Sequence, residues 1–448
     1  MNIRRIAAAA AALVLAGCAA TSPDALRSSV QQLTRDRPGI SQPDAGGTVQ
    51  ALLARRPLDA DTAVRIALLN NPGLQASYAA LSITDAERVQ AASLPNPHLT
   101  VGRLREGRQL EIERMLSFNV LQLVTLPWRA KYAGQKVELA KLRAAQEVIR
   151  LAADTRKAWF GAVAGRQTAA YMRTAKEAAE AGAELARRMA RVGNWSRLQQ
   201  AREQSTLAEL TAQLARAEQQ ALAEREKLTR LMGLWGAQAD YALPERLPEL
   251  PKALPERGDI EAQALRERLD VRAARDEARY VADSLGFVRA TGVIDALEIG
   301  VVRKTTFDDA AGTRETGRGA EISLPLPVFD WGQGRNAQAQ ATYMQAVARV
   351  RGAAVQARSE AREAWHGWRT AYDLARHYQD EIVPLRKFIS DETVLRYNGM
   401  LASVWDLLSE TRNHVAAVNG AIEAQRDFWI ADTDLNMVLT GTSAEALR

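Results

Sequence analysis

The same order of elements is written twice along this chain, and the duplication limits the folds that it can adopt. Trp159 lies 34 residues before Gly193, and Trp365 lies 34 residues before Gly399. The residues around the tryptophans agree as well, with Ala before Trp and Gly two residues after it in both places. Each copy predicts helix, helix, β-hairpin, long helix and long helix, so we expect a mainly α fold with a small membrane β part.

The two copies divide the chain into expected parts. A proline-rich stretch between them predicts a linker or a short irregular module. The residues that precede the first copy are rich in Ser, Pro, Gly and Asp without a sustained period, which predicts an extended arm. The expected parts are a signal peptide at 1–17, an arm at 18–57, a first repeat at 58–234, a linker at 235–257, a second repeat at 258–440 and a tail at 441–448.

The first hairpin is expected at about 97–124. Apolar and polar residues alternate from 109 to 120, and this period of two predicts a strand with one apolar face. Residues 99–101 predict the partner strand, joined to it through Glu106 and Gly107.

The second hairpin is expected at about 295–328. Residues 297–301 and 320–324 alternate in the same way, and a polar, glycine-containing loop is expected between them at 304–315. Ser117 and Asn119 are expected to face water. The apolar positions expected to face lipid are Leu110, Ile112, Leu116, Phe118, Leu297, Ile299 and Val301.

Two short hairpins do not make a stable isolated sheet, and the outer strands have unpaired edges. In a membrane every such edge has to be closed, which requires a barrel. Four strands are too few for one chain to close a transmembrane barrel alone. Several copies of the chain are therefore expected to close it together.

Long helices are expected at about 130–191 and 197–234, where Ala, Leu, Glu, Gln, Arg and Lys dominate and proline is absent. A helix of some sixty residues is roughly 90 Å long. A glycine turn separates the helices, and a serine follows that is suited to cap the second one. The turn residues singled out are Gly193, Asn194 and Ser196 in the first copy and Asn398, Gly399 and Met400 in the second.

The N-terminus predicts export. Arg4 and Arg5 precede an apolar run at 6–15 that is too short to span a bilayer. This pattern is typical of a signal peptide. The Leu-Ala-Gly-Cys sequence that ends at Cys18 resembles the bacterial lipoprotein signal, in which the cysteine is acylated. No aspartate follows Cys18, which by the rule for such signals favours the outer membrane.

Composition excludes several classes of protein. Lys and Arg number 59 against 53 Asp and Glu, a net charge of +6 that does not indicate nucleic-acid binding. One Cys and four scattered His leave no metal-ligand pattern. No phosphate-binding glycine loop or nucleophile motif is present. We therefore expect no enzyme and no cofactor apart from covalent lipid at Cys18, and energy for any transport would come from a partner.

The duplicated plan, the proline-rich midpoint and the glycine turns resemble the TolC-type family of outer-membrane efflux proteins, in its lipoprotein branch. The resemblance covers about residues 58–440. It implies a homotrimer in a Gram-negative outer membrane, with a twelve-stranded β-barrel continued by an α-helical barrel. It also implies passive exit for a tripartite efflux system, with a periplasmic adaptor protein contacting the tip turns and an inner-membrane pump supplying energy.

The resemblance also singles out Asp406. In the family an aspartate after the tip glycine projects into the tube, where three copies form an acidic ring that attracts cations. Mutual repulsion in such a ring would raise the pKa of the carboxyl. One extra residue separates Gly399 from Asp406 relative to the family pattern, which would turn the side chain by about 100°. In the first copy Gln200 is the expected counterpart.

Other functions remain open at this stage. One is a structural coiled-coil lipoprotein that bridges the envelope layers without a channel. Another is a duct for type I protein secretion, which would use the same fold with other inner-membrane partners. For an efflux duct, the branch resemblance favours drugs or metal cations as substrate. The amphipathic hairpins favour a channel, since a coiled-coil lipoprotein that only bridges the envelope layers does not require amphipathic strands.

Overall fold

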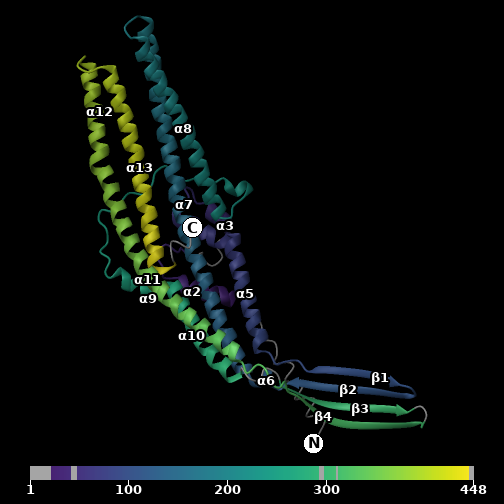
Figure 1. Cartoon of the computed structure of the whole chain (residues 1–448). Helices are drawn as coiled ribbons and strands as arrows, with labels where there is room; N and C mark the ends of the chain where they lie inside the picture. The colour runs from purple at the N-terminus through teal and green to yellow at the C-terminus, as the bar shows by residue number, and fades with distance from the viewer. Residues whose placement is uncertain (1–21, 42–47, 292–296, 309–310, 443–448) are drawn as a thin grey trace. The chain divides into compact units, whose positions relative to one another are not determined.

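The computed structural model of the chain describes residues 22–41, 48–291, 297–308 and 311–442, so Cys18 and the expected signal peptide lie outside it. Long helices and one antiparallel sheet make up these residues (Figure 1). Unit 1 comprises the described residues up to Val30 with Tyr78–Arg143 and Arg272–Ala353; unit 2 comprises the remainder. In the described part of the chain, no helix is both long and apolar enough to cross a membrane.

The expected N-terminal arm is partly helical, which corrects the prediction of an extended segment. It contains α2 (Pro23–Thr34) and α3 (Val49–Leu53). A signal for α2 is present in the sequence, because Leu26, Val30 and Leu33 repeat at helical spacing. Val30 is fully buried. The prediction relied on the Ser, Pro, Gly and Asp content of the segment and therefore missed this helical period.

Two pairs of helices precede the two hairpins. Each pair begins at an aspartate N-cap, because Asp59 accepts a hydrogen bond from the Thr62 N–H at 2.6 Å and Asp259 accepts one from the Ala262 N–H at 3.0 Å. The helices of the first pair are α4 (Ala60–Asn70) and α5 (Pro72–Ala92), and those of the second are α9 (Ile260–Glu267) and α10 (Leu269–Thr291).

Unit 1 contains a four-stranded antiparallel sheet in the order β1-β2-β3-β4 (Figure 1). Gly107, with φ of +56°, allows the tight turn between β1 and β2. The two hairpins join where β2 pairs with β3, with Leu116 opposite Val301. The strands are β1 (His98–Glu106), β2 (Gln109–Asn119), β3 (Glu298–Asp308) and β4 (Thr313–Ser323).

The strands differ from the predicted ones at their ends. β3 and β4 occupy most of the expected loop at 304–315, with Lys304 opposite Gly317 and Asp308 opposite Thr313. Most side chains there are polar on both faces, so the alternation disappears although the ladder continues. At the other end of β2, the predicted strand residue Val120 instead begins the short helix α6 (Val120–Val124).

The expected rods are continuous helices. α7 has 66 residues, which gives a length of about 100 Å. A π-helical turn at Tyr378–Ile382 links α11 to α12 without a break. The long helices are α7 (Leu126–Arg191), α8 (Arg197–Leu231), α11 (Gln333–His377), α12 (Val383–Asn398) and α13 (Val404–Thr440).

The core of unit 2 contains Trp159 and Trp368. Trp159 is buried and its Nε1–H donates to the Leu58 carbonyl at 2.9 Å. Trp368 is buried beside Phe428, and its Nε1–H donates to Asp432 Oδ1 at 3.0 Å. Each indole therefore pairs its polar group while burying its ring.

The proline-rich segment between the two halves is fixed against the helices of unit 2. Its residues Leu243, Leu247 and Leu250 are buried. The Pro248 carbonyl accepts hydrogen bonds from Gln425 at 2.7 Å and from Trp429 at 3.0 Å. The segment thus connects the halves along a packed path, with only a short 3₁₀ turn at Gly236–Ala239.

Arg268, at the junction of α9 and α10, is the largest of the fully buried side chains, at 1% exposure. Its guanidinium donates to both oxygens of Asp270, at 3.0 and 2.6 Å, and to Glu360 Oε2 at 2.7 Å. One buried cation therefore holds two carboxylates from separate helices.

Candidate functional site

One face of the sheet carries an apolar band of exposed side chains. The register aligns Leu99, Leu116 and Val301 in one rank and Phe118, Ile299 and Ile322 in the next. These six side chains, here called the apolar band, are between 37% and 69% exposed. Exposed apolar side chains in contiguous ranks mark a surface that requires a partner or a lipid environment.

Not every residue expected on this face lies in the band. Leu110 and Ile112 share the face but lie nearer the hairpin tips, and both are half-buried. Leu297 lies just outside β3, and its carbonyl accepts a hydrogen bond from the Val120 N–H at 2.8 Å.

The opposite face of the sheet is polar, but it does not leave every side chain in water. Lys304 pairs with Glu111 at 2.6 Å. Ser117 is only 4% exposed, because it lies against Gly300, where an added Cβ would come within 3.3 Å of the serine Cβ. Asn119 is half-buried and accepts a hydrogen bond from the Gln122 N–H at 2.9 Å. The expectation that Ser117 and Asn119 simply face water is therefore wrong for the isolated chain.

The first tip turn joins α7 to α8. Gly193 has φ of +78°, and its N–H donates to the Ala190 carbonyl while the Asn194 N–H donates to the Met189 carbonyl. This is the Schellman pattern that ends a helix. Ser196 then caps α8 in a capping box with Gln199.

The second tip turn has the same geometry, with Met400 in the place of Gly193. Met400 has φ of +58° and donates to the Tyr397 carbonyl, while Leu401 donates to the Arg396 carbonyl. Gly399, which we expected to make the turn, has φ of −81° and is the C-cap of α12. Figure 1 shows both turns at the same end of the long helices.

Asp406 lies at the third position of α13 and completes a capping box with Ser403. The Ser403 N–H and hydroxyl donate to Asp406 Oδ2 at 2.9 and 2.6 Å. These hydrogen bonds hold the pKa of Asp406 below its ordinary value of 3.8. A lowered carboxyl pKa means that this cap stabilises the helix above pH 3.8 and is lost as the pH falls through the lowered value.

The capping boxes settle which residues of the two tips correspond. Ser196 and Ser403 occupy the same position, so Gln199 and not Gln200 is the counterpart of Asp406. The extra residue counted from Gly399 lies before α13 begins, because Gly399 is the C-cap of α12 and Met400 takes the place of Gly193 in the turn. It does not rotate Asp406 around α13, so the predicted 100° displacement is wrong.

Replacing Met400 with glycine is expected to stabilise the second tip. A left-handed conformation costs a residue with a Cβ roughly 1–2 kcal/mol, and glycine avoids this cost. Part of the gain is offset by the greater freedom of glycine in the unfolded chain. Hydrogen exchange at the Leu401 amide should therefore slow in Met400→Gly. Gly193→Ala is the matched opposite change and should accelerate exchange at Asn194. Faster exchange in Met400→Gly would contradict the assigned turn.

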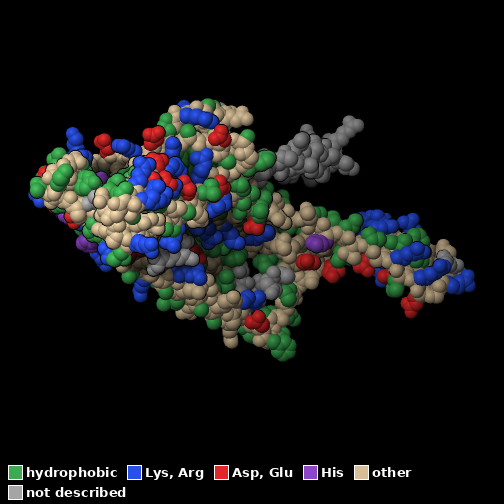
Figure 2. Space-filling view, turned by 90° about the horizontal axis from the view of Figure 1, so that it is seen from above, with side chains coloured by type: hydrophobic (Ala, Val, Ile, Leu, Met, Phe, Trp, Pro, Cys, Tyr) green, Lys and Arg blue, Asp and Glu red, His purple; other side chains and the backbone are tan. Residues whose placement is uncertain are grey.

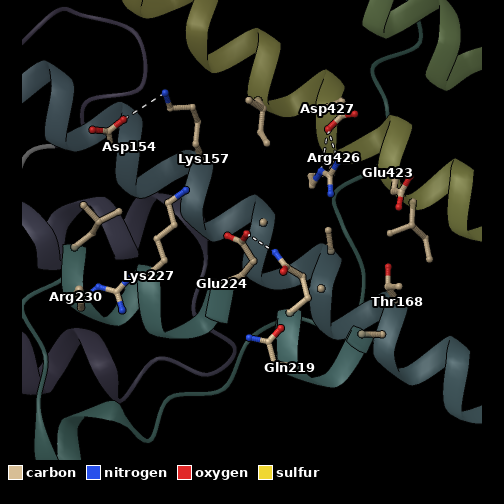
Figure 3. Close-up of a pocket in the computed structure, with 18 of the residues that line it drawn as sticks. Asp154, Lys157, Thr168, Gln219, Glu224, Lys227, Arg230, Glu423, Arg426 and Asp427 are labelled. Carbon is tan, nitrogen blue, oxygen red and sulfur yellow. Dashed lines mark hydrogen bonds and ion pairs between the residues drawn. The ribbon is translucent and has the colours of Figure 1, made fainter. Parts of the chain in front are cut away.

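A charged groove of about 980 Å³ lies between α7, α8 and α13 in unit 2. Six basic and five acidic side chains line it, including Lys227, Arg230 and Glu423 (Figure 3). Lys157 pairs with Asp154 at 3.3 Å and with Asp434 at 3.0 Å. The charges are nearly balanced, so the groove suits a hydrated surface better than a site for one kind of ion.

Small residues on α7 permit its close approach to α8 beside this groove. A Cβ on Gly165 would come within 3.0 Å of the Ala221 Cα, and one on Gly161 would come within 2.8 Å of Glu224 Oε2. The two glycines therefore set the spacing of the helices. Among the residues that the structure describes, no three His, Cys, Asp or Glu side chains form a group that could hold a metal ion.

A row of arginines is the part of the sheet that our sequence reasoning missed. Arg114, Arg303 and Arg318 stand opposite one another on β2, β3 and β4, on the face of the apolar band. The alternation contained a signal for it, because Arg114 interrupts the apolar positions between Ile112 and Leu116. Only the register brings the other two arginines alongside.

With its four-stranded sheet and long helices, the chain is similar in fold to solved bacterial outer-membrane channels. Similar solved structures include the Campylobacter jejuni CmeC outer membrane channel, at 16% identity and a TM-score of 0.72 over 90% of this chain and 89% of that one. The Vibrio cholerae outer membrane protein VceC is 16% identical, with a TM-score of 0.69 over 88% of this chain and 99% of that one.

A membrane protein from Pseudomonas aeruginosa is 19% identical, with a TM-score of 0.72 over 85% of this chain and 92% of its own. No protein-family model and no curated protein sequence matches the chain. The structural likeness agrees with the resemblance to TolC-type channels drawn from the sequence.

Proposed function

We propose that the chain is one subunit of a homotrimeric outer-membrane channel that gives passive exit for a tripartite efflux system. Three copies would each contribute β1–β4 to a twelve-stranded barrel, and their long helices would form a tube through the periplasm. Acylation of Cys18 would anchor each copy to outer-membrane lipid. The chain is a duct in this proposal and not an enzyme, and an inner-membrane pump supplies the energy. Drugs or metal cations are the proposed substrates.

The observation that carries this proposal is the open sheet with an exposed apolar band. β1 and β4 lie at the edges of the sheet, where each has one side unpaired within the described chain. Unpaired edges and apolar side chains are both unstable in lipid unless neighbouring chains close the sheet. The strands have 9 to 11 residues, the length that a tilted strand needs to span a bilayer.

The proposal is tested by closing the sheet covalently. Thr100→Cys in β1 and Glu321→Cys in β4 place thiols on the two edge strands, and Cys18 is the one natural cysteine. Oxidation of the double variant should yield linked dimers and trimers, whereas each single variant should not yield trimers. The purified trimer should also form discrete pores in planar bilayers. Monomers without conductance would favour the structural coiled-coil lipoprotein instead. Linked trimers with pores but no efflux phenotype would favour protein secretion.

We also propose that the chain arose by internal duplication. The order of α4, α5, β1 and β2 recurs as α9, α10, β3 and β4. Trp159 lies 37 residues before Ser196, but Trp365 lies 38 residues before Ser403. The π-helical turn at Tyr378–Ile382 lies within the longer interval. A π turn accommodates one additional residue without breaking a helix, so it accounts for the difference.

The tip turns are the proposed contact for a periplasmic adaptor protein. Met400 and Leu401 are 94% and 82% exposed. Exposed apolar side chains at a turn held in one conformation by two helix ends suit recognition by a partner. The first tip offers Gly193, Asn194 and Ser196 in the matching geometry.

Asp406→Asn is expected to weaken the block of the channel by multivalent cations added from the periplasmic side and to reduce cation preference. If three Asp406 carboxylates form a ring at the tip, their removal lowers the negative potential at the opening. Gln199→Glu is the matched opposite variant, since it adds a carboxylate at the equivalent position of the first tip. Reversal potentials should shift in opposite directions in the two variants. Unchanged values in both would show that Asp406 serves only as a helix cap.

A further inference from the structure

The row of Arg114, Arg303 and Arg318 is unusual because like charges occupy one rung of the ladder. Adjacent strands are about 4.8 Å apart, so the three residues span about 10 Å across the sheet. Like charges directly opposite one another destabilise a sheet. All three side chains are exposed. A bound anion would offset this repulsion.

The residues that the structure describes do not provide that anion. None of the side-chain hydrogen bonds or ion pairs found among the described residues involves Arg114, Arg303 or Arg318, whose backbones pair within the ladder. The acidic residues of the sheet, such as Glu111 and Glu113, point to the opposite face because side chains alternate along a strand. Figure 2 shows Lys and Arg side chains gathered along one side of this part of the molecule and Asp and Glu along the other.

The three arginines also line a groove together with part of the apolar band. The groove measures about 400 Å³, and its apolar lining includes Leu99, Leu116 and Val301. A ligand that fits both parts has an anionic head and hydrocarbon chains. Guanidinium groups bind phosphate with paired, charge-assisted hydrogen bonds.

The position of the row along the strands agrees with such a lipid. From Arg318 to Leu326 there are eight residues, or about 26 Å of extended chain. A lipid-facing band of a barrel is about 25 Å tall and is flanked by aromatic side chains. Phe329 and Trp331 are exposed beyond Leu326 and fit one boundary. The arginine row then fits the opposite boundary, at the level of the lipid headgroups, with Leu110 and Ile112 beyond it.

We propose that Arg114, Arg303 and Arg318 form a binding site for the phosphate-bearing headgroup of an outer-leaflet glycolipid, whose acyl chains lie on the apolar band. This inference rests on the proposed function, because it requires the sheet to lie in the outer membrane. The three guanidinium groups hold the phosphates, and Leu99, Leu116 and Val301 contact the chains.

The test uses the full-length protein in detergent, titrated with lipid A and followed by native mass spectrometry. The variant Arg114→Gln/Arg303→Gln/Arg318→Gln should bind lipid A at least about ten-fold more weakly than the wild type, since paired phosphate contacts are lost. Dephosphorylated lipid A should bind the wild type as weakly as intact lipid A binds the triple variant. Inorganic phosphate should not displace lipid A at millimolar concentration. Displacement would show a site for free anions and would overturn the proposal.

A matched control variant changes the net charge by the same amount, but at residues outside the sheet. Arg272, Arg275 and Arg279 are exposed on α10, and their triple replacement by Gln should leave lipid A binding unchanged. If the sheet variant does not assemble, the corresponding Lys variant keeps the charge, and it should bind at an intermediate strength.

The two proposals fail in different ways. Suppose that the wild type forms outer-membrane trimers and that the triple arginine variant binds lipid A as tightly as the wild type does. The proposed headgroup site is then wrong, whereas the proposed channel function is unaffected. If the wild type is neither trimeric nor found in outer membranes, the proposed function itself is wrong.

Discussion

Replacing Arg268 with alanine is expected to lower the free energy of unfolding by about 3–5 kcal/mol. The side chain is 1% exposed and pairs with Asp270 and Glu360, so its loss leaves two carboxylates without their cation. Unfolding of the detergent-solubilised protein in rising urea, followed by its helical circular dichroism, measures the change. The contact between α9–α10 and α11 should be the first to open.

Two variants separate the loss of pairing from a general effect of losing an arginine. Arg272 contacts Asp276 at 3.8 Å and is 58% exposed, so Arg272→Ala should cost less than about 1 kcal/mol. Arg268→Leu combined with Glu360→Leu should be less destabilising than Arg268→Leu alone, because it also removes a carboxylate that has lost its buried cation. A double variant as unstable as the sum of the single variants would show that the ion pairs contribute nothing.

The position of Arg268 illustrates what sequence periodicity cannot predict. Its partner Glu360 lies 92 residues away, and nothing in the local sequence distinguishes it from the exposed arginines nearby. The helix breaks were predictable because they depend on local signals such as Asn71-Pro72 and the pair Pro95 and Pro97. Burial of a charge depends on distant partners and appears only in the fold.

The tips show a similar division between local and distant information. Capping by Ser196 and Ser403 follows from residue type, and both serines begin their helices. Counting residues from Trp365 placed the turn at Gly399, but the turn lies at Met400 because the π turn within the helix absorbs one residue. A single-residue insertion inside a long helix leaves no signal in composition or period.

The sheet was predictable wherever one face is apolar and the other polar. The alternation from Leu110 to Phe118 identified β2, and Ile299 with Val301 identified β3. Beyond the arginine row both faces of β3 and β4 are mainly polar, so these two strands continue without a periodic signal. Pairing between the hairpins is not encoded locally either, because five α-helices, α6 to α10, and a 3₁₀ turn lie between β2 and β3 in the sequence.

A lysine in the apolar band is expected to cost about 2–4 kcal/mol if the band faces lipid at mid-membrane depth. Val301 is 61% exposed and lies on an inner strand of the sheet, opposite Leu116 and Ala320, so Val301→Lys places a charge at the centre of the band. If the chain forms the proposed trimer, the fraction of trimer recovered from outer membranes and its urea midpoint in lipid vesicles should both fall. Detergent-free aqueous solution would not impose this cost.

The control for this change lies one residue away from the band. Leu99 and Thr100 are adjacent on β1, both exposed, but on opposite faces of the sheet. Leu99→Lys should impair trimer recovery as Val301→Lys does, whereas Thr100→Lys should be mild because its face is polar. Ser117 is unsuitable for this purpose, since its side chain lies against Gly300 and any larger residue would disturb the packing. Equal damage from Leu99→Lys and Thr100→Lys would show that neither face meets lipid. Damage confined to Leu99 and Val301 requires a lipid-facing band, because only hydrocarbon distinguishes adjacent exposed positions by face.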